Sequence, residues 1–395
     1  MRQPDAIIIG GGIQGATIAL AASERGLRTV IVERNELAAG ASGNSYGIIH
    51  GGLRYLQTLD IARWKRSKNA QAWYLEHFPE FVRPLRCVMP LYRWRWRSAF
   101  FFRTAVLFEN LLAKVFKIEV TLPKTTFIPA AATKNQYAKL PESGLSGAAC
   151  WYDAEVTNMP VVIAAILQKS GLDSSAVMTN TEATELLVRE DRVAGVRVKN
   201  NTSGEISDIE SNIVINCTGS WAGHWQPTTS TAVTAPTAAA LAFNLLLDLP
   251  AVGDGALALS VTPGKGRCYF MRPYPGGMLA GTFYIPAPGM TEPQVSDSAI
   301  QQFLSELALA FPGLEIMNAK VLKVMAGLLP DTDGSGTSLS SQDYILSHDL
   351  EGFYTVLGGK LTTAPLLSRD AVKRIWPKKQ SALHVIPPAL DKQRV

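Results

Sequence analysis

The residues with the clearest chemical role lie near the start of the chain, in the run Gly10-Gly11-Gly12-Ile13-Gln14-Gly15. Glycines at positions 10, 12 and 15 allow a tight turn, a close approach of the backbone to a pyrophosphate and close packing of helix on strand. Glu33 follows at the distance where a carboxylate can accept hydrogen bonds from a ribose diol. These residues predict a dinucleotide site, and the charge of Glu33 disfavours a 2′-phosphate.

The elements around these glycines are the ones that such a site needs. Residues 6–9 are apolar, as in a parallel strand buried on both faces, and residues 29–33 predict a second strand. Between them, residues 16–25 predict a helix whose free N–H groups and positive dipole end face a phosphate. FAD and NAD fit this strand–helix–strand unit equally well.

A second group of reactive residues follows in the run His50-Gly51-Gly52-Leu53-Arg54-Tyr55-Leu56. This run resembles a signature of the FAD-dependent glycerol-3-phosphate dehydrogenases, in which it lies beside the flavin. Residues 214–222 and 358–363 are similar to two further FAD-contacting segments of that family, in the same order. The resemblance extends with gaps over residues 4–376, and it identifies the cofactor as FAD.

The resemblance also implies roles for single residues. Arg54 would stabilise a developing alkoxide on the substrate side of the flavin, and Tyr55 would orient it. His50 has a suitable solution pKa for a proton acceptor, but it could instead only buttress the loop. Lys360 would support the reduced flavin, whose negative charge favours nearby cations. The predicted FAD contacts are Gly10, Gly12, Ile13, Gln14, Gly15, Glu33, Arg34, Ala41, Ser42, Ser45, Gly51, Gly52, Leu53, Thr218, Gly219, Trp221, Gly327, Gly359, Lys360, Leu361 and Thr362.

Two positions depart from the family at its phosphate-binding arginines. Leu329 stands where the family has the arginine of a Gly-x-Arg-Pro turn, and Gln342 stands where a second arginine precedes an Asp-Tyr pair. Arginine holds phosphate by paired, charge-assisted hydrogen bonds that leucine cannot supply. We therefore expect a less charged or more apolar substrate. Arg272 is a candidate to bind a carboxylate or a relocated phosphate, and a salt-bridged arginine on a strand is the alternative.

Residues 91–118 are aromatic and basic, with apolar side chains at positions 94, 101, 105, 108, 112 and 115 in a helical stripe. One interpretation is an interfacial helix on an anionic membrane surface, which would let reduced FAD reach a membrane quinone. The other is a helix packed over the substrate domain. No apolar stretch approaches the ~20 residues of a membrane-spanning helix.

The pattern of elements predicts an α/β fold, with a Rossmann-like FAD domain of the D-amino-acid-oxidase type and an inserted mixed or antiparallel substrate domain. Residues 1–80, 145–225 and 335–380 are assigned to the FAD domain, and residues 81–144 and 226–334 to the substrate domain. Residues 381–395 form a polar tail. The resemblance implies that contacts from the helical domain that follows in the family are absent or replaced here.

Composition narrows the partners. A net charge of +5 favours anionic ligands or an anionic membrane surface, while the absence of any run of five Lys or Arg argues against nucleic acid. The four cysteines form no CxxC pair, so we expect neither a zinc site nor a disulfide framework. The same pattern predicts a reducing compartment. The amino terminus lacks a signal-peptide pattern, which favours the cytoplasm, with peripheral attachment to the inner face of the membrane as an alternative.

The expected activity is oxidation of a glycerol-3-phosphate-like secondary alcohol, with hydride transfer to flavin N5 and electrons passed to quinone. Two alternatives stay open. One is an amine or 2-hydroxy-acid oxidoreductase of the same superfamily. The other is a flavin-binding subunit of a complex, without turnover of its own.

Overall fold

The computed structural model describes residues 3–92, 99–116, 118, 122–225, 238–262, 265–331 and 343–377. Six of its strands form a first sheet in the order β17-β18-β11-β1-β2-β7, and all neighbours are parallel except β17 and β18. Every side chain of β1 is buried, as its continuous apolar run predicts. The strands are β1 (Ala6–Ile9), β2 (Thr29–Val32), β7 (Val177–Met178), β11 (Val214–Asn216), β17 (Asp343–Ser347) and β18 (Phe353–Gly358).

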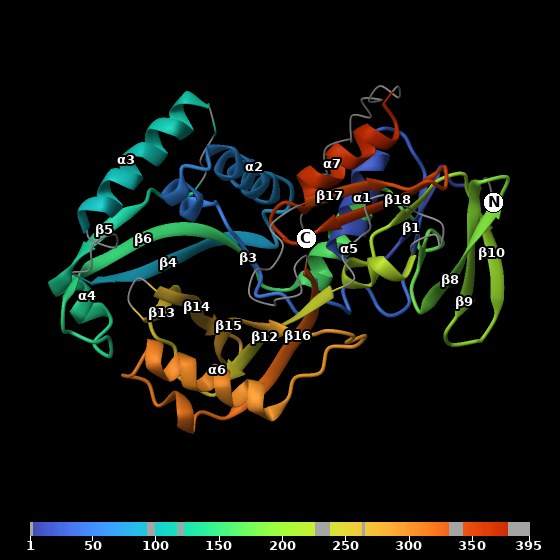
Figure 1. Ribbon diagram of the computed structural model, residues 1–395. Helices are drawn as coiled ribbons and strands as arrows, with labels where there is room; N and C mark the ends of the chain where they lie inside the picture. Colours follow the sequence, from blue (N-terminus) through green and yellow to red (C-terminus); the bar gives the residue numbers. More distant parts are fainter. Residues whose placement is uncertain are drawn as a thin grey trace, which may run out of the picture.

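The first sheet is the middle of three layers. Helices α1 (Ile13–Ser23), α5 (Met159–Lys169) and α7 (Ala364–Ile375) pack on one face in a shared apolar core. The other face is covered by a three-stranded antiparallel sheet of β8 (Thr181–Arg189), β9 (Arg192–Asn200) and β10 (Ile206–Glu210) (Figure 1). Two covered faces explain why the central strands of the first sheet, β1, β2 and β11, are mostly apolar.

A second, nine-stranded sheet lies beside the first unit, with the order β16-β12-β15-β14-β13-β4-β6-β3 and with β5 paired to β6. It is mixed, because β13 and β4 are parallel while the other neighbours are antiparallel. The strands are β3 (Ile48–Ile49), β4 (Val82–Tyr92), β5 (Thr126–Pro129), β6 (Leu145–Val156), β12 (Ala238–Leu247), β13 (Ala256–Thr262), β14 (Lys265–Tyr274), β15 (Gly277–Pro286) and β16 (Val321–Asp331).

Helices cover this sheet on both sides (Figure 1). Helix α6 (Asp297–Ala310) packs against strands β12 to β15 in a second apolar core, and α2 (Ile61–His77) and α3 (Ala99–Val115) lie on the opposite side. The remaining elements are η1 (Leu53–Thr58), α4 (Ala130–Gln136), η3 (Gly219–Trp225) and η4 (Ile316–Asn318). Within the described residues, no helix is both long enough and apolar enough to cross a bilayer.

The expected fold class is confirmed, and the sheets refine the division of the chain. Strands β11 and β18, which lie within the ranges assigned to the FAD domain, pair with each other and join the first sheet. Strands β3 and β6, however, pair within the second sheet, although the predicted boundaries at residues 80 and 145 assign them to the FAD domain. Their sequences alternate only weakly, so nothing local indicated which sheet they join. Residues 381–395 lie outside the described residues.

Candidate functional site

The glycine turn after β1 has no room for side chains. Gly10 has a φ of +111°, and a Cβ there would lie 2.7 Å from the carbonyl oxygen of Cys217. A Cβ on Gly15 would lie 2.0 Å from the carbonyl oxygen of Gly10, so α1 packs directly on the turn. Gly12 precedes α1 without a side-chain cap. The turn therefore has the shape that brings backbone N–H groups to a phosphate.

Glu33 closes the turn from the carboxyl end of β2. One carboxylate oxygen accepts a hydrogen bond from the backbone N–H of Gly11 at 2.6 Å, and the other accepts one from Asn35 at 2.9 Å. Each carboxylate oxygen can accept a second hydrogen bond. Glu33 thus holds the glycine turn and keeps acceptor capacity for a ribose diol.

The loop after Glu33 folds back over the start of α1. Ser42 Oγ accepts a hydrogen bond from the N–H of Ile13 at 3.0 Å. Ala41 lies close to Gly327, because a Cβ added to Gly327 would be 2.6 Å from the Cα of Ala41. The buried hydroxyls of Ser45 and Ser220 make no hydrogen bond within the described part of the chain. Because buried polar groups are normally satisfied, these two hydroxyls fit a ligand with acceptor groups, such as a dinucleotide.

A stacked pair lies at the outer end of this turn. The Arg34 guanidinium lies 4.5 Å from the ring centroid of Trp221 and forms a 2.8 Å ion pair with Glu292. The indole N–H of Trp221 donates to the backbone oxygen of Thr291 at 2.8 Å. This hydrogen bond connects Trp221, a predicted FAD contact in η3, to the loop that follows β15. Thr218 donates to Asn216, and Gly219 has open space around it.

Asp153, on β6, organises the run that begins at His50. Its carboxylate accepts hydrogen bonds from the Gly51 N–H at 2.7 Å, the His50 Nδ1 at 2.9 Å and the Trp151 indole N–H at 3.2 Å. Burial alone would raise the pKa of Asp153, but the His50 ring and these hydrogen bonds lower it, and the net shift is downward. An ionised carboxylate accepts only, so Nδ1 carries the proton and Nε2 is left as an acceptor on a half-exposed ring.

Sequence reasoning missed Asp153. It is one of two acids, with Glu155, among mostly apolar residues on β6, and its partner His50 is distant in the chain. The local signal was a carboxylate that the alternation of side chains along the strand would bury, with no basic residue near it in the sequence. Such an acid needs a distant partner, which the sequence could not name.

Tyr55 brings two further predicted residues together. Its hydroxyl accepts a hydrogen bond from Lys360 Nζ at 2.7 Å, and the Arg54 guanidinium lies 5.4 Å from its ring centroid. Burial acts to raise the pKa of Tyr55, but the hydrogen bond and charge of Lys360 and the charge of Arg54 lower it, and the net shift is downward. The cluster is therefore a patch of positive potential on the loop that begins at His50.

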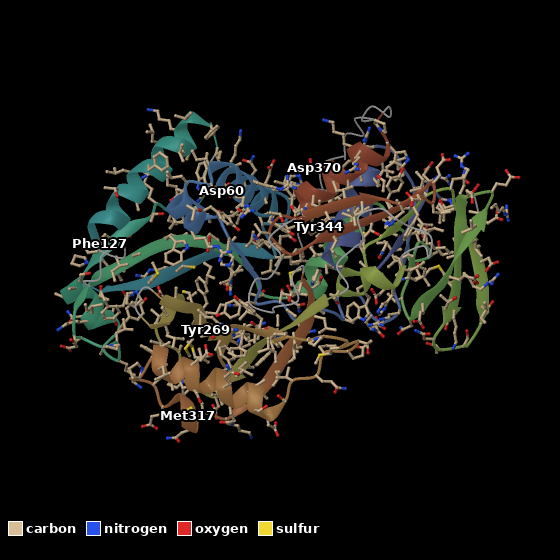
Figure 2. The ribbon with its side chains drawn as sticks, in the orientation of Figure 1. Asp60, Phe127, Tyr269, Met317, Tyr344 and Asp370 are labelled. Atoms are coloured by element: carbon tan, nitrogen blue, oxygen red, sulfur yellow. The ribbon has the colours of Figure 1, made fainter. Side chains whose placement is uncertain are left out.

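The segment after β18 holds these loops in place. Thr362 Oγ1 accepts from the backbone N–H of His50 at 3.2 Å, and the Leu361 carbonyl accepts from Tyr74 at 3.0 Å. Helix α7 begins at Ala364, so residues 361–363 form the connecting turn and Gly359 precedes it. Arg66 of α2 pairs with Asp370 of α7 at 2.9 Å, and Figure 2 shows Asp370 on the side of α7 that faces α2.

Two predicted site residues are paired with other side chains of the protein. Arg272 is 3% exposed and forms a 2.8 Å ion pair with Glu155, which favours the salt-bridged alternative over an anion-binding one. Gln14 is turned toward α7, where its amide donates to Ser368 at 2.7 Å, so its side chain does not face the glycine turn. Both pairings join residues far apart in the sequence.

The departures from the family pattern lie on the second sheet. Leu329 is partly exposed and pairs opposite Ala240, while its neighbour Leu328 packs in the core under α6. Because side chains alternate along a strand, Leu329 and Gly327 lie on the sheet face away from α6. That face also meets Ala41 of the FAD loop. Gln342 lies outside the described residues.

Comparison with known proteins gives the family. Residues 5–374 match the model of the FAD dependent oxidoreductase family. The mitochondrial glycerol-3-phosphate dehydrogenase of Bos taurus is 27% identical over 385 residues, which cover 93% of this chain and 52% of that protein. The chain thus spans about half the length of the first curated relatives that it matches.

Solved structures show the same fold. A Bacillus halodurans glycerol-3-phosphate dehydrogenase complexed with FAD superimposes with a TM-score of 0.72 at 19% identity, over 96% of this chain and 66% of that one. A glycine oxidase from Bacillus cereus superimposes with a TM-score of 0.67 at 15% identity, over 96% of both chains. The family model covers nearly the whole described chain, including the glycine turn and the His50 loop. The chain belongs to the FAD dependent oxidoreductase family.

Proposed function

We propose that this chain oxidises a secondary alcohol related to glycerol 3-phosphate. The observation that carries the proposal is the His50–Asp153 pair, because it presents an imidazole acceptor next to the positive Arg54–Tyr55–Lys360 cluster. Removal of a hydroxyl proton needs such an acceptor, and the resulting oxygen charge needs such a cluster. Relatives named glycerol-3-phosphate dehydrogenase support this class of substrate.

The residues that would hold FAD are those around the glycine turn. Gly10, Gly12 and Gly15 leave the backbone open to the pyrophosphate, and Glu33 would bind the ribose of the adenosine part. The serine hydroxyls of the loop and of η3, which lack partners in the described structure, would donate to the cofactor. When bound, FAD supplies the acceptor for the two electrons and the carbon-bound hydrogen that the alcohol loses.

The side chains beside the flavin loops then have separate tasks. His50 Nε2 accepts the hydroxyl proton, and Asp153 fixes the ring so that Nε2 faces outward. Arg54, which is exposed, contacts the oxygen as negative charge develops on it. Arg272 is paired with Glu155, so we no longer propose it as a substrate ligand.

Anaerobic titration of the holoprotein with glycerol 3-phosphate tests the proposal. The expected result is bleaching of the visible flavin band by this or another secondary alcohol. Absence of bleaching by every alcohol, while dithionite still reduces the flavin, would overturn it.

A second candidate function rests on a separate observation. Leu329 presents an apolar surface where the family has arginine. Ala240 pairs opposite Leu329 on the neighbouring strand, so both lie on the same face of the sheet. This surface favours a substrate with less charge, such as a 2-hydroxy acid or an amine. Including both classes in the titration separates the candidates by their products, since a 2-hydroxy acid gives a 2-oxo acid, a primary amine gives a carbonyl compound and ammonia, and glycerol 3-phosphate gives dihydroxyacetone phosphate.

The exposed apolar side chains of helix α3 support the proposal that the electron acceptor lies in a membrane. Of the predicted stripe, Phe108 and Leu112 pack inward with Trp64, whereas position 115 is exposed; residue 94 lies outside the described residues. A separate row formed by Leu107, Leu111 and Val115 is 57% to 70% exposed at helical spacing. We propose that this row inserts into an anionic bilayer and brings the flavin domain to a quinone.

Replacement of Leu107, Leu111 and Val115 by serine should abolish binding to anionic vesicles, because each exposed apolar side chain contributes roughly 1.5–3 kcal/mol when buried. Co-sedimentation with vesicles of phosphatidylserine and phosphatidylcholine measures the loss. Val188→Ser, at an equally exposed apolar position on β8, is the matched control and should bind as the parent does. Equal binding by the triple variant would contradict the proposed surface.

A further inference from the structure

Tyr55 lies between two cations. Lys360 Nζ is 2.7 Å from its hydroxyl oxygen and 5.3 Å from its ring centroid, and the Arg54 guanidinium is 5.4 Å from the same centroid. Among the described residues, no ion pair joins either cation to a carboxylate. In the described part of the site, no carboxylate thus forms an ion pair that would neutralise the positive charge around this phenol.

The hydrogen bond has a fixed direction. A lysine ammonium group only donates, so the hydroxyl oxygen of Tyr55 accepts from Lys360. The hydroxyl hydrogen must then point away from Lys360. Since burial, which raises the pKa of Tyr55, is outweighed by the two cations, this hydrogen is more acidic than that of an ordinary tyrosine. An acidic O–H that points away from its activating cation is a strong donor to a ligand oxygen.

We propose that Tyr55 donates a hydrogen bond to the substrate oxygen as negative charge develops on it, and that Lys360 acts on the reaction through Tyr55. This inference rests on the proposed oxidation of an alcohol. The hydroxyl proton passes to His50 Nε2 and Tyr55 keeps its proton throughout, while bound FAD would supply the acceptor for the carbon-bound hydrogen and its electron pair. Tyr55 is then a catalytic residue, and Lys360 is a positioning residue rather than a direct support of the flavin.

The position of the cluster supports this assignment. Tyr55 follows His50 on the same loop, and the His50 backbone N–H donates to Thr362, two residues after Lys360. The loop that carries the acceptor and the donor is thus hydrogen-bonded to the segment that carries Lys360. An oxygen between His50 and Tyr55 would lose its proton to one side chain and gain a stabilising hydrogen bond from the other. Removal of one such donor typically slows a reaction by about 10²–10³-fold.

The ionisation of Tyr55 can be measured without a substrate. NMR of holoprotein labelled with ¹³Cζ-tyrosine follows each phenol through an alkaline titration, and the signal lost in Tyr55→Phe identifies Tyr55. We expect it to ionise before an ordinary tyrosine in the parent, and later in Lys360→Met. Lys360→Arg should restore the parent behaviour. Tyr74→Phe is the matched control, because Tyr74 contacts the same segment at Leu361 while burial raises its pKa.

Kinetics with a flavin-reducing alcohol provide the second measurement. Activity should fall with rising pH as Tyr55 loses its proton, this limb should move to higher pH in Lys360→Met, and it should be absent in Tyr55→Phe. Lys360→Met and Tyr55→Phe combined should be no slower than Tyr55→Phe alone. Additive losses, or a Tyr55 titration unchanged by Lys360→Met, would overturn the inference. If no alcohol reduces the flavin, the proposed function fails, whereas the NMR titration still tests the Lys360–Tyr55 coupling by itself.

Discussion

Asparagine in place of Asp153 is expected to slow reduction of the bound flavin by about 10²–10⁴-fold, the range associated with a general base. The carboxylate accepts the Nδ1 proton of His50, which leaves Nε2 free to accept the substrate proton. An asparagine amide can donate to Nδ1 instead, so the ring would carry its proton on Nε2 and could no longer act as an acceptor. Stopped-flow measurement of flavin bleaching with a reducing alcohol gives the rate.

The tautomer itself is a direct readout. In ¹⁵N-histidine-labelled protein, the parent should show the proton of His50 on Nδ1, and Asp153→Asn should move it to Nε2. Asp173→Asn is the control, since Asp173 lies in an exposed turn and accepts hydrogen bonds from Ser175 and Ala176 of that turn. An Asp153→Asn protein that keeps its flavin, its tautomer and its rate would show that the pair does not serve the reaction. His50→Gln should then also leave the rate unchanged, because the ring would only buttress the loop.

The glycine turn could be predicted from sequence because its requirements are local. Gly10, Gly12 and Gly15 succeed one another within a single turn, and the β1–α1–β2 unit around them is continuous in the chain. The strands β11 and β18 were also recognisable, since short buried apolar runs before glycine turns suit a parallel sheet. These features predict the fold class and a dinucleotide site, while FAD is implied by the resemblance of the run that begins at His50.

The partners of the reactive side chains could not be predicted in the same way. Asp153 meets His50 across 103 positions, and Lys360 meets Tyr55 across 305. Arg272 was recognised as a charged residue on a strand, but its neutralisation by Glu155 depends on how β14 and β6 are placed in the sheet. Sequence patterns thus identified which groups are present, while the pairing that decides their protonation and charge came only with the tertiary structure.

The role of Leu329 leads to the second large expected effect. Leu329→Arg should tighten binding of glycerol 3-phosphate to the holoprotein by about 10- to 100-fold, since hydrogen bonds to a charged group contribute about 1.5–3 kcal/mol and 1.4 kcal/mol is a factor of ten. The position tolerates the longer side chain because Leu329 is partly exposed and lies on the sheet face away from α6. Anaerobic calorimetric titration of dithionite-reduced holoprotein, which cannot oxidise the ligand, measures the change in affinity.

Three comparisons separate phosphate recognition from general effects of the substitution. Leu329→Met keeps the volume and adds no charge, so it should bind as the parent does. Leu329→Lys adds the charge without the planar fork, and it should gain less than arginine does. Glycerol has no phosphate, so its binding should be the same in all four proteins. Leu329→Arg could tighten binding of glycerol as much as binding of glycerol 3-phosphate, or it could tighten binding of neither ligand. Either result would show that Leu329 does not face the anionic end of the substrate. In that event the apolar surface around Ala240 has another role, and the resemblance to the phosphate-binding family ends at the flavin.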